Sequence, residues 1–272
     1  MHFKEKYGPW AIIAGSAEGL GEAWSRALAK RKLNLLMIDH QGDKLQKLSA
    51  ELEQCEGILT RTLVLDLKDD HAAEKIMAVD EAVDCRLLIY NAAYSLIKAF
   101  TTTEPEELDS FIDINIRSQI KLVHSFSNHL LAKGHGGGII MMSSLAGLLG
   151  MQLVAPYAAT KAFAWNLAEA LHHELHPHGI DVMACIAGAT ATPAYLDTNP
   201  QYGKLKPLVM KPPDVAEAGL EKLGKKTLFI AGRSNRINYF ILTRLLPRKL
   251  ASRIANNTMG KMYAAKNSSP AE

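Results

Sequence analysis

Three polar residues, Ser144, Tyr157 and Lys161, stand at the spacing Ser-x12-Tyr-x3-Lys. Pro156 favours the start of a helix, and in that helix Tyr157 and Lys161 lie at i and i+4 on one face. A phenol has an ordinary pKa of about 10 and is a poor base near neutral pH, but a neighbouring ammonium lowers its pKa by stabilising the phenolate. A serine hydroxyl close by hydrogen-bonds the oxygen of an alcohol or a carbonyl. The pattern therefore predicts general acid–base proton transfer, whereas Tyr-x3-Lys alone is typical of an exposed helix face.

A glycine-rich segment near the N-terminus predicts a second site. The apolar run Trp10–Ala14 has the composition of a strand, and Glu22–Arg31 has that of a helix. The segment between them carries glycines at 15, 19 and 21, which let the backbone approach a pyrophosphate closely. The helix that follows would present free N–H groups and its positive dipole end. The spacing is Gly-x3-Gly-x-Gly and not the commoner Gly-x-Gly-x-x-Gly, and an ordinary tight turn is the alternative interpretation.

Further motifs follow these two in a definite order along the chain. Asp39 follows the second predicted strand, Asp66 the third, and Asn91-Ala92-Ala93 the fourth. Together with the glycine turn and the Ser-Tyr-Lys spacing, they resemble the classical short-chain dehydrogenase/reductase family over nearly the whole chain. The resemblance implies a catalytic tetrad of Asn115, Ser144, Tyr157 and Lys161, in which Asn115 helps to hold a water that relays protons to Lys161. It also implies cofactor contacts from Gly15, Ser16, Glu18, Gly19, Leu20, Gly21, Asp39, His40, Asp66, Leu67, Asn91, Ala92, Ala93, Tyr157, Lys161, Gly188, Thr190 and Thr192.

Three positions depart from the residues that this family usually carries. Ala14 stands in place of a threonine, Ala93 in place of the glycine of Asn-Ala-Gly, and Ala187 in place of the proline of Pro-Gly. Each change exchanges one small residue for another or relaxes a rigid turn. We therefore expect altered local geometry and an intact catalytic set.

Length and patterning predict one α/β domain over residues 1–272. The chain is 48% hydrophobic and 22% charged, which is typical of a globular domain. Continuous apolar strands alternate with helical patterns, which implies a doubly wound parallel sheet of Rossmann type, with helices on both faces and ligands beyond the carboxyl ends of the strands. After the first strand, the predicted strands are Leu33–Ile38, Thr60–Leu65, Arg86–Tyr90, Gly138–Met142, Ile180–Ile186 and Thr227–Ala231. After the first helix, the predicted helices are Gln41–Gln54, His71–Val79, Pro105–Leu131, Tyr157–His176 and Pro213–Leu223.

Charge at the end of the second predicted strand favours NAD(H). Asp39 stands where a carboxylate accepts hydrogen bonds from the adenosine ribose hydroxyls, and it would repel a 2′-phosphate. NADP-dependent relatives usually carry a basic residue just after this strand or before the second glycine of the turn, where this chain has His40 and Glu18. NADP(H) stays possible because a protonated His40 would pair with phosphate. Helix capping is the alternative role for Asp39 and for Asp66.

Apolar residues around the catalytic serine predict a hydrophobic alcohol or ketone as the substrate. Residues of about 190–211 stand where the resemblance places the family's substrate lid. The proline, glycine and asparagine content of Ala194–Met210 favours a mobile loop that closes over cofactor and substrate. Core packing is the alternative for most of the apolar residues. Those expected to form a wall are Leu145, Leu148, Leu149, Met151, Leu153 and Val154, and those of the lid are Tyr195, Leu196, Tyr202, Leu205 and Leu208.

The C-terminal segment is strongly basic. Residues 225–272 contain ten Lys or Arg and one acidic residue, a balance of +9 in a chain of net charge +3. The part at about 234–262 interleaves apolar and basic residues, and Pro247 divides it into two short helices. Packing on its own domain or on a second subunit is the favoured interpretation, and peripheral contact with a membrane surface or an acyl-chain entrance is the alternative. Nucleic-acid binding is disfavoured because no recognition motif accompanies the modest overall charge.

Cysteine and histidine usage indicates neither a disulfide framework nor a metal site. Three scattered cysteines without Cys-x-x-Cys indicate reduced thiols in a cytoplasmic compartment. Around His172 and His176, Pro177 occupies the position of the second histidine of His-Glu-x-x-His, so a solvated helix end is favoured. The apolar stretch Ile139–Pro156 approaches the length of a membrane span, but its serines and glycines favour a buried strand followed by a loop.

These observations predict an NAD(H)-dependent oxidoreductase that interconverts a hydrophobic secondary alcohol and its ketone, of lipid, steroid or acyl type. The alternatives are an NADP(H)-dependent carbonyl reductase and, in a different class, a non-catalytic nucleotide-sensing or membrane-docked scaffold. The family resemblance also implies a homodimer or homotetramer assembled through the two long helices, Pro105–Leu131 and Tyr157–His176.

Overall fold

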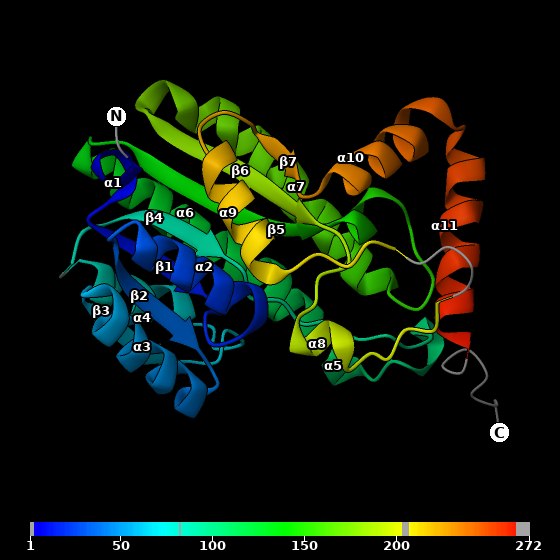
Figure 1. Ribbon diagram of the computed structural model, residues 1–272, viewed down its shortest axis with the longest axis horizontal. Helices are drawn as coiled ribbons and strands as arrows, with labels where there is room; N and C mark the ends of the chain where they lie inside the picture. Colours follow the sequence, from blue (N-terminus) through cyan, green and yellow to red (C-terminus); the bar gives the residue numbers. More distant parts are fainter. Residues whose placement is uncertain (1–2, 82, 203–206, 265–272) are drawn as a thin grey trace.

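The sheet of this protein has seven parallel strands in the order β3-β2-β1-β4-β5-β6-β7 (Figure 1). The computed structural model describes residues 3–81, 83–202 and 207–264. From β1 the chain adds β2 and β3 on one side of the sheet, then returns to add β4 to β7 on the other side. The sheet is therefore doubly wound, with a topological switch point between β1 and β4. The predicted parallel α/β sheet is confirmed. The strands are β1 (Trp10–Ala14), β2 (Asn34–Asp39), β3 (Thr60–Val64), β4 (Cys85–Tyr90), β5 (Gly137–Ser144), β6 (Ile180–Ala187) and β7 (Leu228–Ile230).

Helices cover both faces of this sheet because successive strand side chains point to opposite sides. In β1, Ile13 packs in one core with α1, α2, α3 and α9, whereas Ile12 packs in the other with α4, α6 and α7. The strands are therefore apolar on both faces, as expected for a buried parallel sheet. The helices of these layers are α1 (Phe3–Tyr7), α2 (Gly19–Lys30), α3 (Gly42–Glu56), α4 (Ala72–Asp80), α6 (Ser118–Lys133), α7 (Ala155–Leu175) and α9 (Pro212–Lys222).

The predicted helix Pro105–Leu131 has an interruption. It consists of α5 (Pro105–Ile112), the π-helical segment η2 (Asp113–Arg117) and α6. Single π-helical turns within α-helices occur frequently at functional sites, and this one carries Asn115. The interruption could not be read from the apolar pattern, which continues through it.

The apolar stretch at 139–156 is strand and loop, as predicted. It forms most of β5, then residues 145–154, and then the first turn of α7, where Pro156 lies. We refer to residues 145–154 as the catalytic loop; its first part is the 3-10 turn η3 (Leu145–Leu148). Among the described residues, no helix has both the length and the apolarity needed to cross a membrane.

The C-terminal segment forms two helical stretches on either side of Pro247, as predicted. The first is α10 (Arg233–Phe240), which continues into the π-helical segment η5 (Ile241–Leu245), and the second is α11 (Arg248–Met262). Both lie at the side of the molecule, beyond the sheet (Figure 1). Ala251 and Ala255 of α11 are buried against the catalytic loop, so the favoured prediction that the tail packs on its own domain is confirmed for this face.

Candidate active site

The glycine turn after β1 is closed so tightly that side chains would not fit. Gly15 has a φ of 79°, and a Cβ atom there would lie 2.7 Å from the Ala92 Cα atom. A Cβ atom on Gly21 would lie 1.8 Å from the carbonyl oxygen of Gly15. No side chain caps the N-terminus of α2. The N–H groups of Gly21 and Glu22 donate to the Glu18 carbonyl oxygen, which leaves those of the two helix residues before Gly21, together with the helix dipole, available to an anion. This cradle fits the pyrophosphate of a dinucleotide.

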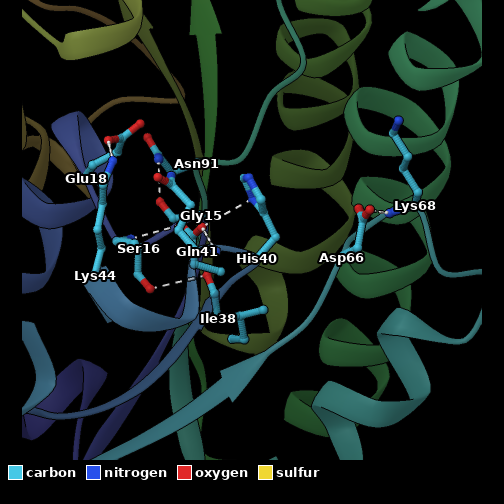
Figure 2. Close-up of polar contacts among 12 residues, drawn as sticks. Gly15, Ser16, Glu18, Ile38, His40, Gln41, Lys44, Asp66, Lys68 and Asn91 are labelled. Carbon is cyan, nitrogen blue, oxygen red and sulfur yellow. Dashed lines mark hydrogen bonds and ion pairs between the residues drawn. The ribbon is translucent and has the colours of Figure 1, made fainter. Parts of the chain in front are cut away.

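The turn contacts two further strand ends that were predicted to bind a cofactor, those of β4 and β6. The Asn91 side chain donates from Nδ2 to the Gly15 carbonyl oxygen at 2.7 Å (Figure 2). A Cβ atom on Gly19 would lie 3.1 Å from Thr192, which follows β6. The ends of β1, β4 and β6 therefore converge around one position.

Asp39 is buried at the end of β2 and bound to backbone. Its Oδ2 atom accepts from the Ala17 N–H at 2.9 Å and its Oδ1 atom accepts from the Gln41 N–H at 3.0 Å. The carboxylate is 7% exposed, while His40 is exposed and places Nδ1 3.3 Å from Asp39 Oδ1. A negative charge thus stands fixed between the glycine turn and the start of α3.

Glu18 is paired with a cation that the sequence reasoning missed. Lys44, in the first turn of α3, places Nζ 2.6 Å from Glu18 Oε2 (Figure 2). The hydrogen bond from Lys44 lowers the pKa of Glu18, and the same bond raises the pKa of Lys44. Glu18 stands where NADP-dependent relatives usually carry a basic residue, but Lys44 offsets its charge, so the electrostatic argument rests on Asp39. The sequence signal that could have indicated this ion pair is the position of Lys44 just after the second strand, at the carboxyl edge of the sheet.

The remaining predicted contacts lie at the same edge with local partners. Asp66 is exposed, and its Oδ1 atom accepts from the Lys68 N–H at 2.9 Å (Figure 2), while Leu67 beside it is buried. Thr192 caps the short helix α8 (Pro193–Leu196) by accepting from the Tyr195 N–H at 3.2 Å. Contacts of these residues with a nucleotide stay a prediction. The other members of the predicted set also lie at this edge. Leu20 belongs to the first turn of α2, and the segments after β1, β4 and β6 carry Ser16, Ala93, Gly188 and Thr190.

Three of the four predicted catalytic residues lie on β5 and α7. Ser144 ends β5, and its Oγ accepts from the Ala146 N–H at 3.2 Å. Lys161 is 4% exposed, and its Nζ donates to the Met142 carbonyl oxygen at 3.0 Å. The same Nζ atom stands 5.6 Å from the centre of the Tyr157 ring. One helix turn thus brings the phenol and the ammonium together, as the i, i+4 spacing predicted.

The pKa of Tyr157 differs from the expectation. Desolvation raises it above its ordinary value, and a hydrogen bond with Ser144 opposes part of that rise. The ammonium of Lys161 points to the backbone of β5, and burial lowers the pKa of Lys161 to about 8. The prediction that Lys161 depresses the pKa of Tyr157 is therefore wrong for this arrangement. The group whose charge changes near neutral pH is the lysine.

Asn115 joins the loop after β4 to α7, which we call the catalytic helix because it carries the predicted catalytic residues Tyr157 and Lys161. Its Oδ1 accepts from the Tyr94 N–H at 2.7 Å, and its Nδ2 donates to the Tyr94 carbonyl oxygen at 2.9 Å and to Thr160 Oγ1 at 3.0 Å. It is 2% exposed. The side chain is thus occupied by protein partners, and the proton-relay role of Asn115 stays a prediction.

A family model described as short chain dehydrogenase matches residues 9–203. The chain belongs to the short-chain dehydrogenase family. As a member of this family it is an oxidoreductase that uses NAD(P)(H). Its similarity to a 7beta-hydroxysteroid dehydrogenase of Clostridium sardiniense is 31% identity over 236 residues, covering 87% of this chain and 90% of that protein.

Solved structures agree with this assignment. A 7beta-hydroxysteroid dehydrogenase studied for its stereoselectivity has a TM-score of 0.86 at 27% identity and covers 94% of this dehydrogenase and 99% of its own chain. A Sphingobium yanoikuyae short-chain dehydrogenase in complex with NADPH has a TM-score of 0.73 at 25% identity, over 82% and 87% of the two chains. A Mycobacterium paratuberculosis enzyme bound to NAD shares the fold, with a TM-score of 0.72 at 23% identity over 83% and 96%.

The apolar residues predicted to surround the substrate belong to the catalytic loop and to the lid, and the two segments differ in burial. Leu148 and Leu149 pack beneath α11, with Leu145 and Met151 partly buried beside them. Their burial is structural packing, which was the alternative interpretation. In the lid, Leu196 and Leu208 are exposed, Tyr195 and Tyr202 join their hydroxyls at 2.6 Å, and Leu205 lies outside the described residues.

The predicted histidine cluster lies in the last turn of α7 and in the 3-10 turn that follows it. The rings of His172 and His176 stack with centres 4.9 Å apart, which confirms that they face together. In the described part of the chain, no group of three or more histidine, cysteine or acidic side chains is arranged to hold a metal ion.

Proposed function

We propose that this dehydrogenase interconverts a hydrophobic secondary alcohol, of steroid type, and the corresponding ketone. The observation that carries the proposal is the arrangement of Ser144, Tyr157 and Lys161 at the edge of the sheet where the glycine cradle opens. The hydroxysteroid dehydrogenases among its relatives support a steroid-type substrate. A bound nicotinamide would supply or accept the hydride.

The protein residues in this proposal hold and move the proton. Tyr157 Oη takes the hydroxyl proton of the alcohol during oxidation when it is a phenolate, and as a phenol it donates its proton to the carbonyl oxygen during reduction. Ser144, which hydrogen-bonds the phenol, orients the reacting oxygen. Lys161 exchanges the proton onward, because its pKa of about 8 allows it to gain or lose a proton near neutral pH. Asn115 keeps the catalytic helix in register with the loop after β4.

We further infer a preference for NAD(H) over NADP(H). A buried carboxylate at Asp39, fixed by two backbone N–H groups, supports this because it would stand against a 2′-phosphate. Lys44 weakens the argument only if it leaves Glu18, with which it forms an ion pair. Gly15 and Gly21 allow the close backbone approach that shapes the turn proposed to hold the pyrophosphate.

We also propose an oligomeric state and a cellular location for this dehydrogenase. Ile112, Ile120 and Leu131 are exposed on α5 and α6, which supports a homodimer or homotetramer through the long helices, and sedimentation velocity tests it. Free cysteines at 55, 85 and 185 support a cytoplasmic location.

The outward face of α10, η5 and α11 carries features of a membrane-surface segment. Ile237, Phe240 and Leu245 are exposed there, and residues 233–262 contain seven Lys or Arg and no acidic residue. These features support peripheral contact with anionic lipid. Binding to phosphatidylglycerol vesicles that weakens with salt, and is absent on phosphatidylcholine vesicles, is the expected result.

A substrate panel tests the proposed activity. Steroid secondary alcohols and ketones are compared with short 2-alkanols and 2-alkanones, each with both cofactors, by NADH or NADPH absorbance. We expect kcat/KM for the best steroid to exceed that for the short alcohols by at least about tenfold, because more apolar area is buried on binding. Binding of NADH without turnover of any alcohol or ketone would instead support the non-catalytic nucleotide-sensing alternative.

A further inference from the structure

The C-terminal helix α11 is packed onto the catalytic loop, which joins Ser144 on β5 to the α7 helix that carries Tyr157 and Lys161. Leu148 and Leu149 of the loop are 9% and 6% exposed and form one apolar cluster with Ala251 and Ala255 of α11. This helix lies outside the residues that match the family model, which end at 203. A segment beyond the family match therefore supports a loop at the centre of the site.

One polar residue of α11, Asn256, binds the catalytic loop by three hydrogen bonds. Its Oδ1 accepts from the Gln152 N–H at 2.7 Å, and its Nδ2 donates to the Gly150 carbonyl oxygen at 2.9 Å. Its backbone carbonyl oxygen accepts from Gln152 Nε2 at 2.6 Å. A further bond, from Nδ2 to the Ser252 carbonyl oxygen at 2.8 Å, fixes the amide on its own helix. Donor and acceptor of the Asn256 side chain are thus both directed at the loop.

The loop residue that follows Gln152 has an unfavourable backbone conformation. Leu153 has a φ of 65°, in the left-handed region that is uncommon for residues other than glycine. Its side chain is buried, and its carbonyl oxygen accepts from the Lys98 N–H at 2.9 Å. A conformation of this kind persists only where neighbouring contacts enforce it, and such residues cluster at active sites. Asn256 supplies the contacts on the N-terminal side of Leu153.

The same loop lies directly against the catalytic helix. A Cβ atom on Gly147 would lie 2.7 Å from the carbonyl carbon of Lys161 and from the N atom of Ala162. The loop backbone and α7 are therefore in close contact at the position of the predicted catalytic lysine. A displacement of the loop would alter the placement of Ser144 relative to α7.

The end of α11 also binds the lid. The Gln201 N–H donates to the Met262 carbonyl oxygen at 2.9 Å, and the hydroxyls of Thr198 and Tyr263 lie 3.0 Å apart. One rigid helix thus contacts the catalytic loop near its middle and the described part of the lid near its end (Figure 1).

We propose that Asn256 is a positioning residue for the reaction, holding the catalytic loop in its strained conformation and thereby setting Ser144 against Tyr157. The proposal rests on the proposed dehydrogenase function. Through α11 the same contacts link the loop to the lid, so the substrate side of the site is ordered by the C-terminal helix.

Asn256→Ala tests the proposal, with Asn257→Ala as the matched control, because Asn257 is the next residue on α11 and is exposed. We expect Asn256→Ala to lower kcat for the best alcohol by about tenfold, as for the loss of several hydrogen bonds, while the Kd for NADH stays unchanged. Asn256→Asp keeps the acceptor for the Gln152 N–H and loses the donor to Gly150, so it should recover part of the loss.

Hydrogen exchange gives a readout that needs no turnover. Amides of residues 145–154 should exchange faster in Asn256→Ala than in Asn257→Ala, and those of the glycine turn should not change. Gln152→Ala removes the third bond between loop and helix, from Gln152 Nε2 to the Asn256 backbone carbonyl oxygen, which Asn256→Ala leaves in place. It should act in the same direction, and because α11 is unchanged in this variant, it covers the case of an unstable α11. If loop exchange and kcat in Asn256→Ala match the control, the proposal is overturned. If the wild type turns over no alcohol or ketone, the proposed function fails, while exchange still decides whether Asn256 holds the loop.

Discussion

The cofactor side and the substrate side of the site are held by different kinds of contact. At the glycine turn, the N–H groups of Gly15 and Ser16 both donate to the Ile38 carbonyl oxygen at 2.8 and 3.1 Å. The side chains of Asp39 and Asn91 add bonds from the ends of the neighbouring strands, so the turn is fastened by the sheet itself. The catalytic loop depends instead on side chains from a distant helix, above all Asn256. The cofactor side is thus part of the sheet, whereas the substrate side is an assembly of separate segments. Substitutions at Tyr157 or Asn256 should therefore leave the glycine turn intact, although Asn115 links the loop after β4 to α7.

The largest effect that separates the two sides is expected from Tyr157→Phe. The substitution removes the hydroxyl that exchanges the substrate proton and leaves the glycine turn untouched. We expect kcat to fall by about 10² to 10⁴, the range of general acid–base catalysis, with the Kd for NADH unchanged by fluorescence titration. Substantial turnover in this variant would show that another group moves the proton.

The next effect concerns Lys161, whose pKa is about 8 in the folded protein against an ordinary value of 10.5. Between these two pH values the unfolded chain binds more protons, so the free energy of unfolding of the wild type should rise with pH across this window. At 1.36 kcal/mol for each pH unit, the part due to Lys161 is about 3 kcal/mol. Lys161→Met should remove this slope and be more stable than the wild type at pH 7, while losing activity.

Urea unfolding at several pH values from 7 to 10.5 checks this result. Lys249→Met, at an exposed site on α11, is the control for the loss of a lysine as such. An equal slope in wild type and Lys161→Met would mean that the ammonium is not desolvated as described, and would weaken its assignment as the titrating partner of Tyr157.

The smallest effect is expected on the cofactor side. Asp39→Asn removes the charge and keeps an acceptor for the Ala17 N–H, so the preference for NADH over NADPH should narrow by about tenfold, which is 1.4 kcal/mol. Glu18→Gln frees Lys44 from its ion pair with residue 18, so that its ammonium can attract a 2′-phosphate. This variant should narrow the preference for NADH less than Asp39→Asn does, because the Lys44 ammonium is exposed and its charge is screened by solvent. Calorimetric titration of both cofactors measures these changes.

A double variant makes the cofactor test specific. Adding Lys44→Gln to Glu18→Gln should abolish the gain in NADPH affinity if the freed ammonium caused it. A wild type that binds NADPH more tightly than NADH would contradict the argument from Asp39 directly.

The strands and the glycine turn could be predicted from the sequence because their residue types are set by their immediate surroundings in the sheet. A buried parallel strand must be apolar on both faces, which is why β1 and β6 were recognised almost to the residue. The glycine turn was recognised because close backbone approach excludes side chains at Gly15 and Gly21.

Contacts across long sequence separations could not be predicted in the same way. Lys44 meets Glu18 across 26 residues, and Asn256 meets Gln152 across 104; neither pair has a local pattern. The direction of the Tyr157 pKa was missed for a related reason, since it depends on desolvation by the surrounding protein and not on the spacing to Lys161.

The bridge made by Asn115 bears on the order in which ligands arrive. Asn115 forms hydrogen bonds with both the N–H and the carbonyl group of Tyr94, which comes directly after the predicted cofactor contacts at 91–93. It also donates to Thr160, which belongs to the catalytic helix. A nucleotide seated on that loop would stiffen the helix through a single amide, before any alcohol arrives. Turnover should then follow a compulsory sequence, with the nucleotide first on and last off. Its signature in product-inhibition kinetics is competition between the oxidised and reduced nucleotides alone.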